Sequence, residues 1–264
     1  MAQPSAQFWE GILVSNFRQK EILDLARQDG KVTVDELAEQ YNVTVQTIRR
    51  DLADLAASGR LDRVHGGAIV PSGVENIVYG ERRNLNAAGK KEIALACAAA
   101  IPDGASVFMN IGTSTEAVAA ELLDHENLLV VTNNTNIANI LATNRSCEII
   151  LTGGVLRRSD GGLVGMLTAD MVKQFKFDFS VLGCSAIDED GDLLDFDEQE
   201  ILVSRSAIQR SRKVMVVADH DKFTRKAPLT ICSLEDVGVL FTDHELHSGL
   251  ITDCQKWGTD VVAV

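Results

Sequence analysis

Seven short apolar segments recur through the second half of this chain, and stretches with helical spacing separate most of them. The apolar segments are 107–109, 128–132, 147–152, 179–183, 213–219, 237–242 and 261–264. The helical stretches include 114–123, 136–142, 167–175 and 198–210. Uniformly apolar runs of this length are typical of strands buried on both faces. Their alternation with helices predicts an α/β domain with a mainly parallel sheet from residue 92 to 264.

The first 70 residues have a different pattern, that of three short helices in a row. The first is expected over 18–28, where apolar residues have helical spacing before Asp29-Gly30. Thr33 and Glu36 form a capping box that predicts the start of a second helix. Asn42 tolerates the left-handed conformation of a tight turn, and Thr44 caps a third helix that runs to about residue 58.

The third helix has the chemistry of a DNA-reading helix. Its apolar stripe consists of Val45, Ile48, Leu52, Leu55 and Ala56. The other side presents Gln46, Thr47, Arg49 and Arg50 close to the N-terminus capped by Thr44. Arginine can bond guanine with two hydrogen bonds, glutamine can bond adenine, and threonine can contact a base edge or methyl group. This pattern predicts a recognition helix in the major groove of DNA.

Residues 60–69 alternate apolar and polar side chains around Gly66-Gly67, which predicts a short β-hairpin. Beside a recognition helix such a hairpin would be a wing. Its Arg60, Arg63 and His65 would reach backbone phosphates. A small helical bundle with solvated arginines is the alternative interpretation of the same 70 residues.

The charge balance neither requires nor excludes a nucleic-acid partner. The formal net charge is −13, but residues 1–65 carry 8 Lys/Arg against 10 Asp/Glu, and the remainder carries 17 against 28. The acidity therefore lies mostly in the second part, where it favours solubility and discourages indiscriminate DNA binding.

The five cysteines, at positions 97, 147, 184, 232 and 254, are odd in number and too widely spaced for a metal-type pair. Because each lies in or near an apolar run, we expect buried reduced thiols in a cytosolic protein; a catalytic thiol is the alternative. No apolar stretch approaches the ~18–20 residues of a membrane span. No signal peptide is evident.

The turn after the first predicted strand of the α/β domain favours an anion site. Asn110, Gly112, Thr113, Ser114 and Thr115 follow that strand and open a helix. Glycine allows close approach of the backbone, hydroxyls donate hydrogen bonds, and the amides of a helix N-terminus attract phosphate. An ordinary Ser/Thr helix cap is the alternative for this motif.

Further turns that follow predicted strands carry amides, glycines and a carboxylate that could bind ligand oxygens at the same sheet edge. These effector-site candidates are Asn133, Asn134, Gly153, Gly154, Gly162 and Asp188. Lys222 could supply the positive charge for a phosphate, and a solvated surface lysine is its alternative interpretation.

Two stretches resemble a known family. Residues 44–52 (TVQTIRRDL) and 63–68 (RVHGGA) are similar to the signature of DeoR-type repressors, and the resemblance continues to about residue 225. It implies a winged helix-turn-helix domain over 1–70, a connector over 71–91 and a sensor domain over 92–264 that is similar in fold to ribose-5-phosphate isomerase. The implied partners are operator DNA, a phosphorylated sugar or polyol effector, and further copies of the chain in a dimer or tetramer.

The resemblance also suggests which effector to expect. Residues 160–162 (DGG) and 194–197 (LDFD) look most similar to the family members that regulate glycerol 3-phosphate use, which favours glycerol 3-phosphate. The chain departs from the family at Asn110, where an aspartate is common, so an amide replaces a carboxylate that would bond ligand hydroxyls. The family implies no cofactor.

Two other functions remain open from the residues alone. A sugar-phosphate isomerase would need a base, for which Asp188, Glu198 or Glu200 are candidates, with Lys222 stabilising charge. A non-catalytic sugar-phosphate-binding protein would use the N-terminal helices only for contacts. His244 and His247 have metal-ligand spacing, but no third ligand is evident in the sequence, and we expect no metal and no catalytic residue.

Overall fold

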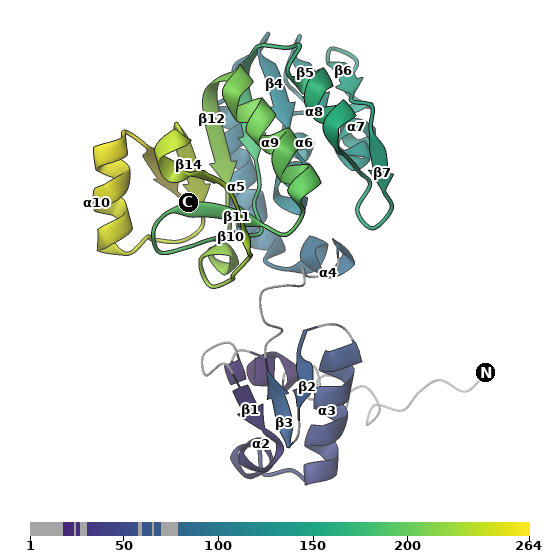
Figure 1. The fold of residues 1–264 in the computed structure, drawn as a ribbon, viewed down its shortest axis with the longest axis vertical. Coiled ribbons are helices and arrows are strands. Elements are labelled where there is room, and N and C mark those ends of the chain that lie inside the picture. Colours follow the sequence, from purple (N-terminus) through teal and green to yellow (C-terminus); the bar gives the residue numbers. More distant parts are fainter. Residues whose placement is uncertain (1–17, 24, 27–30, 58–59, 65, 70–78) are drawn as a thin grey trace, which may run out of the picture. The chain divides into compact units, whose positions relative to one another are not determined.

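A computed structural model describes residues 18–23, 25–26, 31–57, 60–64, 66–69 and 79–264. By its internal contacts the chain divides into two compact units, residues 1–77 and 78–264 (Figure 1). Each unit has its own hydrophobic core.

The N-terminal unit combines helices with a small antiparallel sheet. Residues 18–23 and 25–26 are helical, and the later elements are β1 (Lys31–Thr33), α2 (Val34–Gln40), α3 (Val45–Ala57), β2 (Asp62–Val64) and β3 (Gly67–Ile69). The strand order is β1-β3-β2. The expected capping box forms, since the Thr33 hydroxyl accepts a hydrogen bond from the Glu36 amide. Asn42 adopts the expected left-handed conformation, with φ 49°.

The predicted hairpin of this unit is confirmed, because β2 and β3 pair antiparallel. The third strand of this small sheet, β1, was not predicted from the sequence. Ile22, Leu37, Ile48, Leu52 and Leu55 fill the core. Val45 was expected in the buried stripe of α3, and this prediction is wrong: its side chain is 37% exposed, because it lies on the first turn of the helix.

The second unit is built on a seven-stranded sheet in which every pairing is parallel. The strand order is β15-β14-β12-β9-β4-β5-β6. The strands are β4 (Ser106–Met109), β5 (Leu129–Thr132), β6 (Glu148–Leu151), β9 (Phe177–Leu182), β12 (Ser211–Val217), β14 (Val239–Thr242) and β15 (Asp260–Ala263). All seven apolar segments of the sequence became strands of this sheet, which confirms the predicted fold class.

Helices cover both faces of the sheet (Figure 1). One face packs against α5 (Ala87–Ala99), α6 (Thr113–Glu121) and α7 (Thr135–Leu141). The other packs against α8 (Met166–Val172), α9 (Glu198–Arg210) and α10 (Ser248–Trp257). α5 begins inside the segment that we expected to be a connector, and its Ile93 and Cys97 are fully buried in the core.

Several short elements surround this sheet. They are α4 (Tyr79–Asn84), the hairpin of β7 (Val155–Arg157) and β8 (Gly162–Val164), the small sheet of β10 (Ala186–Ile187), β11 (Asp192–Asp195) and β13 (Leu229–Ser233), and the 3-10 helices η1 (His220–Phe223) and η2 (Leu234–Asp236). The sequence pattern had not distinguished them, since two- to six-residue elements carry too little periodicity.

The direction of winding reverses between β4 and β9. The chain runs from β4 outward to β5 and β6, then returns to the other side of β4 and continues through β9, β12, β14 and β15. Asn110 fastens the two strand ends at this point: its Nδ2 donates to the Gly183 carbonyl at 3.0 Å, and its Oδ1 accepts from the Gly183 amide at 2.9 Å. Ligands of open α/β sheets bind at such a reversal.

Candidate functional site

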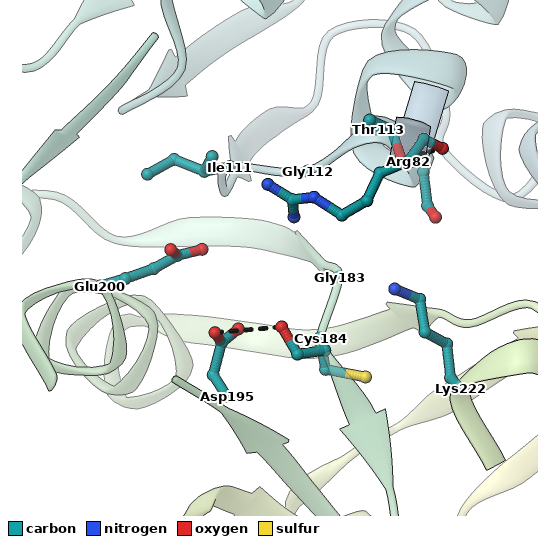
Figure 2. A pocket seen from close by; sticks show the side chains of 11 residues that line it. Arg82, Ile111, Gly112, Thr113, Gly183, Cys184, Asp195, Glu200 and Lys222 are labelled. Carbon is teal, nitrogen blue, oxygen red and sulfur yellow. Dashed lines mark hydrogen bonds between the residues drawn. The ribbon is translucent and has the colours of Figure 1, made fainter. Parts of the chain in front are cut away.

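A pocket lies at the strand reversal, where the ends of β4 and β9 meet (Figure 2). Its lining residues come from α4, the two strand ends, β11, α9 and η1. They are Arg82, Ile111, Gly112, Thr113, Ser114, Gly183, Cys184, Ser185, Asp195, Glu200 and Lys222. Of the predicted effector-site residues, the structure therefore brings together Gly112, Thr113, Ser114 and Lys222.

One wall of the pocket is the N-terminus of α6. The residue at the N-cap position is Gly112, and no side chain caps the helix among the described residues. The Thr115 hydroxyl instead donates to the carbonyls of Asn110 and Gly112, both at 2.9 Å, which fixes the loop. The alternative of a Ser/Thr helix cap is therefore wrong. The amides of the first turn and the positive end of the helix dipole remain available to an anion.

Lys222 brings a buried positive charge to the pocket. It follows β12 on η1 and is 7% exposed, so the alternative of a solvated surface lysine is wrong. Within the described residues its ammonium group has no hydrogen-bond or ion-pair partner. Burial, with the nearby Arg225 charge second, lowers the pKa of Lys222. An anion in the pocket would oppose both effects and raise the pKa of Lys222 again.

Arg82 supplies a second positive charge, which sequence reasoning missed. It lies on α4, and its guanidinium is 3.4 Å from the Asp160 carboxylate. Its Nε is buried and has no hydrogen-bond partner among the described residues. Its backbone carbonyl accepts hydrogen bonds from the Thr113 hydroxyl and the Lys90 ammonium. α4 is thus attached to the first turn of α6 at the pocket.

Lys90 contacts Thr113 in this wall, although it is not itself a lining residue of the pocket. It is buried on α5, and its Nζ lies 3.1 Å from the Thr113 hydroxyl oxygen. Burial lowers the pKa of Lys90 to about 8. Lys90 lies within the segment 71–91 that the family resemblance implied to be a connector.

The opposite side of the pocket is acidic, as Figure 2 shows for Asp195 and Glu200. The Asp195 carboxylate accepts hydrogen bonds from the Ser185 hydroxyl and the Phe196 amide. The Glu200 carboxylate accepts from Arg157 at 2.6 Å. Burial and the nearby Asp195 charge raise the pKa of Glu200 to about 8, so its protonated form is favoured at neutral pH. Burial also raises the pKa of Asp195. Carboxyl oxygens on this side of the pocket suit the hydroxyl groups of a ligand.

The remaining predicted effector residues do not line the pocket. Asn110 and Thr115 are used in holding strand and helix ends together, as described above. Asn133 donates to the Leu163 carbonyl, and Asn134 caps α7 and donates to Glu116. Asp188 lies in the turn between β10 and β11, where its carboxylate accepts from the Asp190 and Asp192 amides.

The predicted glycines lie in the turns around β7 and β8. The Gly153 carbonyl accepts a hydrogen bond from the Thr168 hydroxyl, and Gly154 has a left-handed φ of 140°. Gly162 packs so closely on Ile111 that a Cβ atom would be 2.4 Å from the Ile111 Cδ1. Gly162 therefore shapes the pocket indirectly, since Ile111 is a lining residue.

The recognition helix candidate α3 presents polar side chains outward. Gln46, Arg49 and Arg50 are exposed, and Thr47 is half-buried next to Thr44. The Thr44 hydroxyl oxygen accepts a hydrogen bond from the Thr47 amide at 3.2 Å, as expected of an N-cap. Asp51 is buried and pairs with Arg18 at 2.6 Å, which anchors α3 to the first helix. The helix is not buried, so its polar side is accessible to DNA.

Of the predicted wing residues, Arg63 is exposed on β2 and Arg60 is half-buried just before it. His65 lies outside the described residues.

The histidine and cysteine candidates show no metal-binding arrangement in the described part of the chain, where no cluster of three His, Cys, Asp or Glu residues suits a metal ion. His247 is the N-cap of α10, and its Nδ1 accepts from the Leu250 amide. Cys97, Cys184 and Cys254 are buried as expected, but Cys147 and Cys232 are only partly so. None of the helices that can be described has both the length and the apolar character of a membrane span.

Comparison with protein families covers both units. Residues 85–244 match the family described as "DeoR C terminal sensor domain", and residues 18–74 match the "DeoR-like helix-turn-helix domain". This chain belongs to the DeoR family. The expected resemblance is thus confirmed, with the DNA-binding module first and the sensor domain second in the DeoR chain.

Among its DeoR relatives is the glycerol-3-phosphate regulon repressor of Escherichia coli (strain K12), 45% identical over 86% of this chain and 90% of that protein. The repressor of the same name from Haemophilus influenzae is 44% identical over 94% and 96%. These relatives are transcriptional regulators, not enzymes. A solved structure with partial similarity is ribose 5-phosphate isomerase A from Neisseria gonorrhoeae, at 12% identity and a TM-score of 0.39, covering 52% of this chain and 53% of that one.

Proposed function

We propose that this DeoR-family protein is a transcriptional repressor that releases its operator DNA when a small phosphorylated sugar or polyol, preferably glycerol 3-phosphate, occupies the pocket. The observation that carries the proposal is the division of the pocket into a cationic and an acidic side. Arg82, Lys222 and the N-terminus of α6 lie on the first, and Asp195 and Glu200 lie on the second.

This division suits a ligand with a phosphate at one end and hydroxyl groups at the other. The uncapped amides of α6, the Thr113 hydroxyl and the Lys222 ammonium would bind the phosphate. Asp195, Glu200 and the Ser185 hydroxyl would bind the hydroxyls of the polyol. The relatives named for the glycerol 3-phosphate regulon support this choice of ligand.

The DNA-binding role rests on the exposed side of α3. Gln46, Thr47, Arg49 and Arg50 would contact base edges, with Thr44 at the helix N-terminus. Arg60, Arg63 and His65 would contact phosphates. A homo-oligomer would place two such helices on a palindromic operator with half-sites about 34–36 Å apart.

The signal would pass through α4, which is the first described element after the residues that join the two units. A phosphate bound at Thr113 and Arg82 competes with two contacts that hold α4: the Thr113 bond to the Arg82 carbonyl and the Arg82–Asp160 ion pair. Ligand and DNA would then favour different positions of α4, which is the condition for allosteric coupling.

The test is a titration of the full-length protein on an operator selected from random duplexes, followed by fluorescence anisotropy. Glycerol 3-phosphate is expected to weaken operator binding ~5–150-fold, and operator to weaken glycerol 3-phosphate binding by the same factor. Glycerol alone and inorganic phosphate alone serve as controls and should have little effect. Operator affinity that stays unchanged at saturating glycerol 3-phosphate would contradict the proposal.

A further inference from the structure

The four most exposed large apolar residues of the described chain lie on β7 and α8, two elements that are separated only by β8. Val155 and Leu156 of β7 are 67% and 52% exposed, and Met166 and Leu167 at the start of α8 are 62% and 68% exposed. We name these four residues the hairpin patch. Single exposed apolar residues are common on protein surfaces, but a group of this kind marks an interaction site.

Strand pairing and one hydrogen bond join the two segments that carry the hairpin patch. Val155 pairs with Val164 across the β7–β8 hairpin, and α8 begins two residues later. The loop before β7 is fixed to α8, because the Thr168 hydroxyl donates to the Gly153 carbonyl at 2.7 Å. A Cβ atom added at Gly153 would lie 3.8 Å from the Leu167 Cδ2, so this loop runs beside Leu167.

Ion pairs of Arg157, the last residue of β7, hold the strand that carries half of the hairpin patch. Arg157 bonds Asp160 at 2.7 Å, Asp197 at 2.6 Å and Glu200 at 2.6 Å. These ion pairs fix the hairpin to the N-terminus of α9. The patch is therefore ordered before binding and loses little conformational entropy when a partner covers it.

We propose that the hairpin patch is the surface through which two copies of this chain associate around a two-fold axis. In a two-fold interface the same residues meet their own counterparts, so a patch without charges complements itself. This matters in a chain of net charge −13, because the approach of a second copy is opposed nearly everywhere else.

The charges at the border of the patch favour the same occupant. Exposed Arg158 follows the patch at the end of β7, and exposed Asp170 follows it one turn into α8. A two-fold axis through the patch allows Arg158 of one copy to face Asp170 of the other. The choice of a second copy also rests on the proposed operator binding, since one recognition helix reads only one half-site.

The test is sedimentation of the full-length protein without DNA or effector over a range of concentrations. The wild-type chain is expected to form dimers or larger species at micromolar concentration. Leu167→Asp and Val155→Asp should each raise the dimer dissociation constant at least about 30-fold, the effect of losing one interface hot spot. Leu95→Asp on α5, where Leu95 is 49% exposed outside the patch, is the matched control and should leave association unchanged.

Circular dichroism and the Tm show whether each variant is folded, and the milder Leu167→Ser replaces any variant that is not. Hydrogen exchange of residues 155–167 should slow as the wild-type concentration rises. A monomeric wild-type chain, unchanged association of the folded patch variants, or equal loss in Leu95→Asp would overturn the proposal. Protection of the patch independent of concentration would indicate that another segment of the same chain covers it, which also overturns it.

These results do not depend on the proposed function. Leu167→Asp should still be stabilised by glycerol 3-phosphate in a thermal-shift measurement, because the ligand pocket lies apart from the substituted side chain. Failure of the wild-type protein to respond to glycerol 3-phosphate on DNA contradicts the repressor proposal and leaves the sedimentation result as it is.

Discussion

The hydroxyl of Thr113 donates a hydrogen bond of 3.3 Å to the backbone carbonyl of Arg82. One partner is the first residue of α6 in the pocket, and the other lies on α4. A ligand that forms a hydrogen bond with the Thr113 hydroxyl would therefore break the contact of this hydroxyl with α4.

Thr113→Val should weaken glycerol 3-phosphate binding ~10–150-fold, because a hydrogen bond to a charged group contributes about 1.5–3 kcal/mol. Operator binding should be kept. Thr113→Ser retains the hydroxyl and is the control, so it should bind the ligand nearly as well as wild type. Isothermal titration calorimetry measures both; equal affinity of the valine variant and wild type would place the phosphate elsewhere.

Lys222→Met should raise the stability of the protein and lower its affinity for the ligand. Lys222 is 7% exposed and its ammonium group has no hydrogen-bond or ion-pair partner among the described residues, so its replacement by an apolar chain of similar length should raise the Tm. The same variant should lose ~10–150-fold in affinity for glycerol 3-phosphate, the worth of one charge-assisted hydrogen bond. Differential scanning fluorimetry with and without ligand reports both effects. A variant that is stabilised by the ligand as strongly as wild type would show that Lys222 is not a phosphate ligand.

The pH dependence of stability should reveal Glu200. Burial and the Asp195 charge raise its pKa from the ordinary 4.5 to about 8, so between these values the folded state holds a proton that the unfolded state releases. Its contribution to the free energy of unfolding is therefore complete below about pH 4.5 and is lost as the pH rises through 8.

Glu200→Gln should flatten this fall, which urea unfolding at pH 5.5, 7 and 8.5 can measure. Its exposed neighbour offers the matched control Glu198→Gln, which should follow wild type. Ligand affinity should also decline as the pH passes 8 in wild type, since deprotonation adds a negative charge beside an anionic ligand. Parallel curves for wild type and Glu200→Gln would refute the raised pKa.

Tyr79→Phe should weaken the coupling between operator binding and glycerol 3-phosphate binding. The Tyr79 hydroxyl donates to Glu116 at 2.8 Å and accepts from Asn136 at 2.9 Å, and these bonds hold α4 against α6 and α7. Without them α4 is held less firmly in the state without ligand. The variant should bind operator and glycerol 3-phosphate separately, but with a smaller mutual effect. Full coupling in this variant would indicate a route that bypasses α4.

On the DNA side, Arg50→Ala should lose about 1–3 kcal/mol of discrimination between operator and unrelated duplex. Arg63→Ala should instead weaken binding to both duplexes similarly and flatten the dependence on salt. Lys256→Ala, which removes an exposed charge from α10, is the control and should change neither. Unchanged operator preference of the Arg50 variant would mean that α3 faces DNA with another side.

The parallel sheet could be predicted from the sequence because its strands are buried on both faces and are therefore apolar throughout. The contribution of residues 112–114 to the pocket followed from the same pattern, since they come directly after such a strand. The start of α3 was also readable, because a cap such as Thr44 acts within a few residues of itself. In each case the physical cause is local in the chain.

The other half of the pocket depends on contacts between distant segments, which a single sequence does not reveal. Arg82 lies in a charged stretch that resembles a connector, and only the packing of α4 brings it to Thr113. The sequence offered Glu200 only as a candidate base of an isomerase and Asp195 only as part of the 194–197 motif, and it did not indicate that the small sheet and α9 bury both. Conversely, Asn133, Asn134 and Asp188 have side chains that could bind a polar ligand. In the structure they form hydrogen bonds with other residues of the protein instead.

α4 contains no buried residue, so it is fastened to its surroundings by polar contacts such as the Arg82–Asp160 ion pair rather than by an apolar face. A helix anchored by two or three leucines would need several kcal/mol to be displaced, which is a large share of what a molecule of about ten heavy atoms can supply. The polar attachment keeps the work of switching within the reach of a small metabolite. It also means that the sensitivity of the switch can be tuned by single surface substitutions, without any change to the core of either unit.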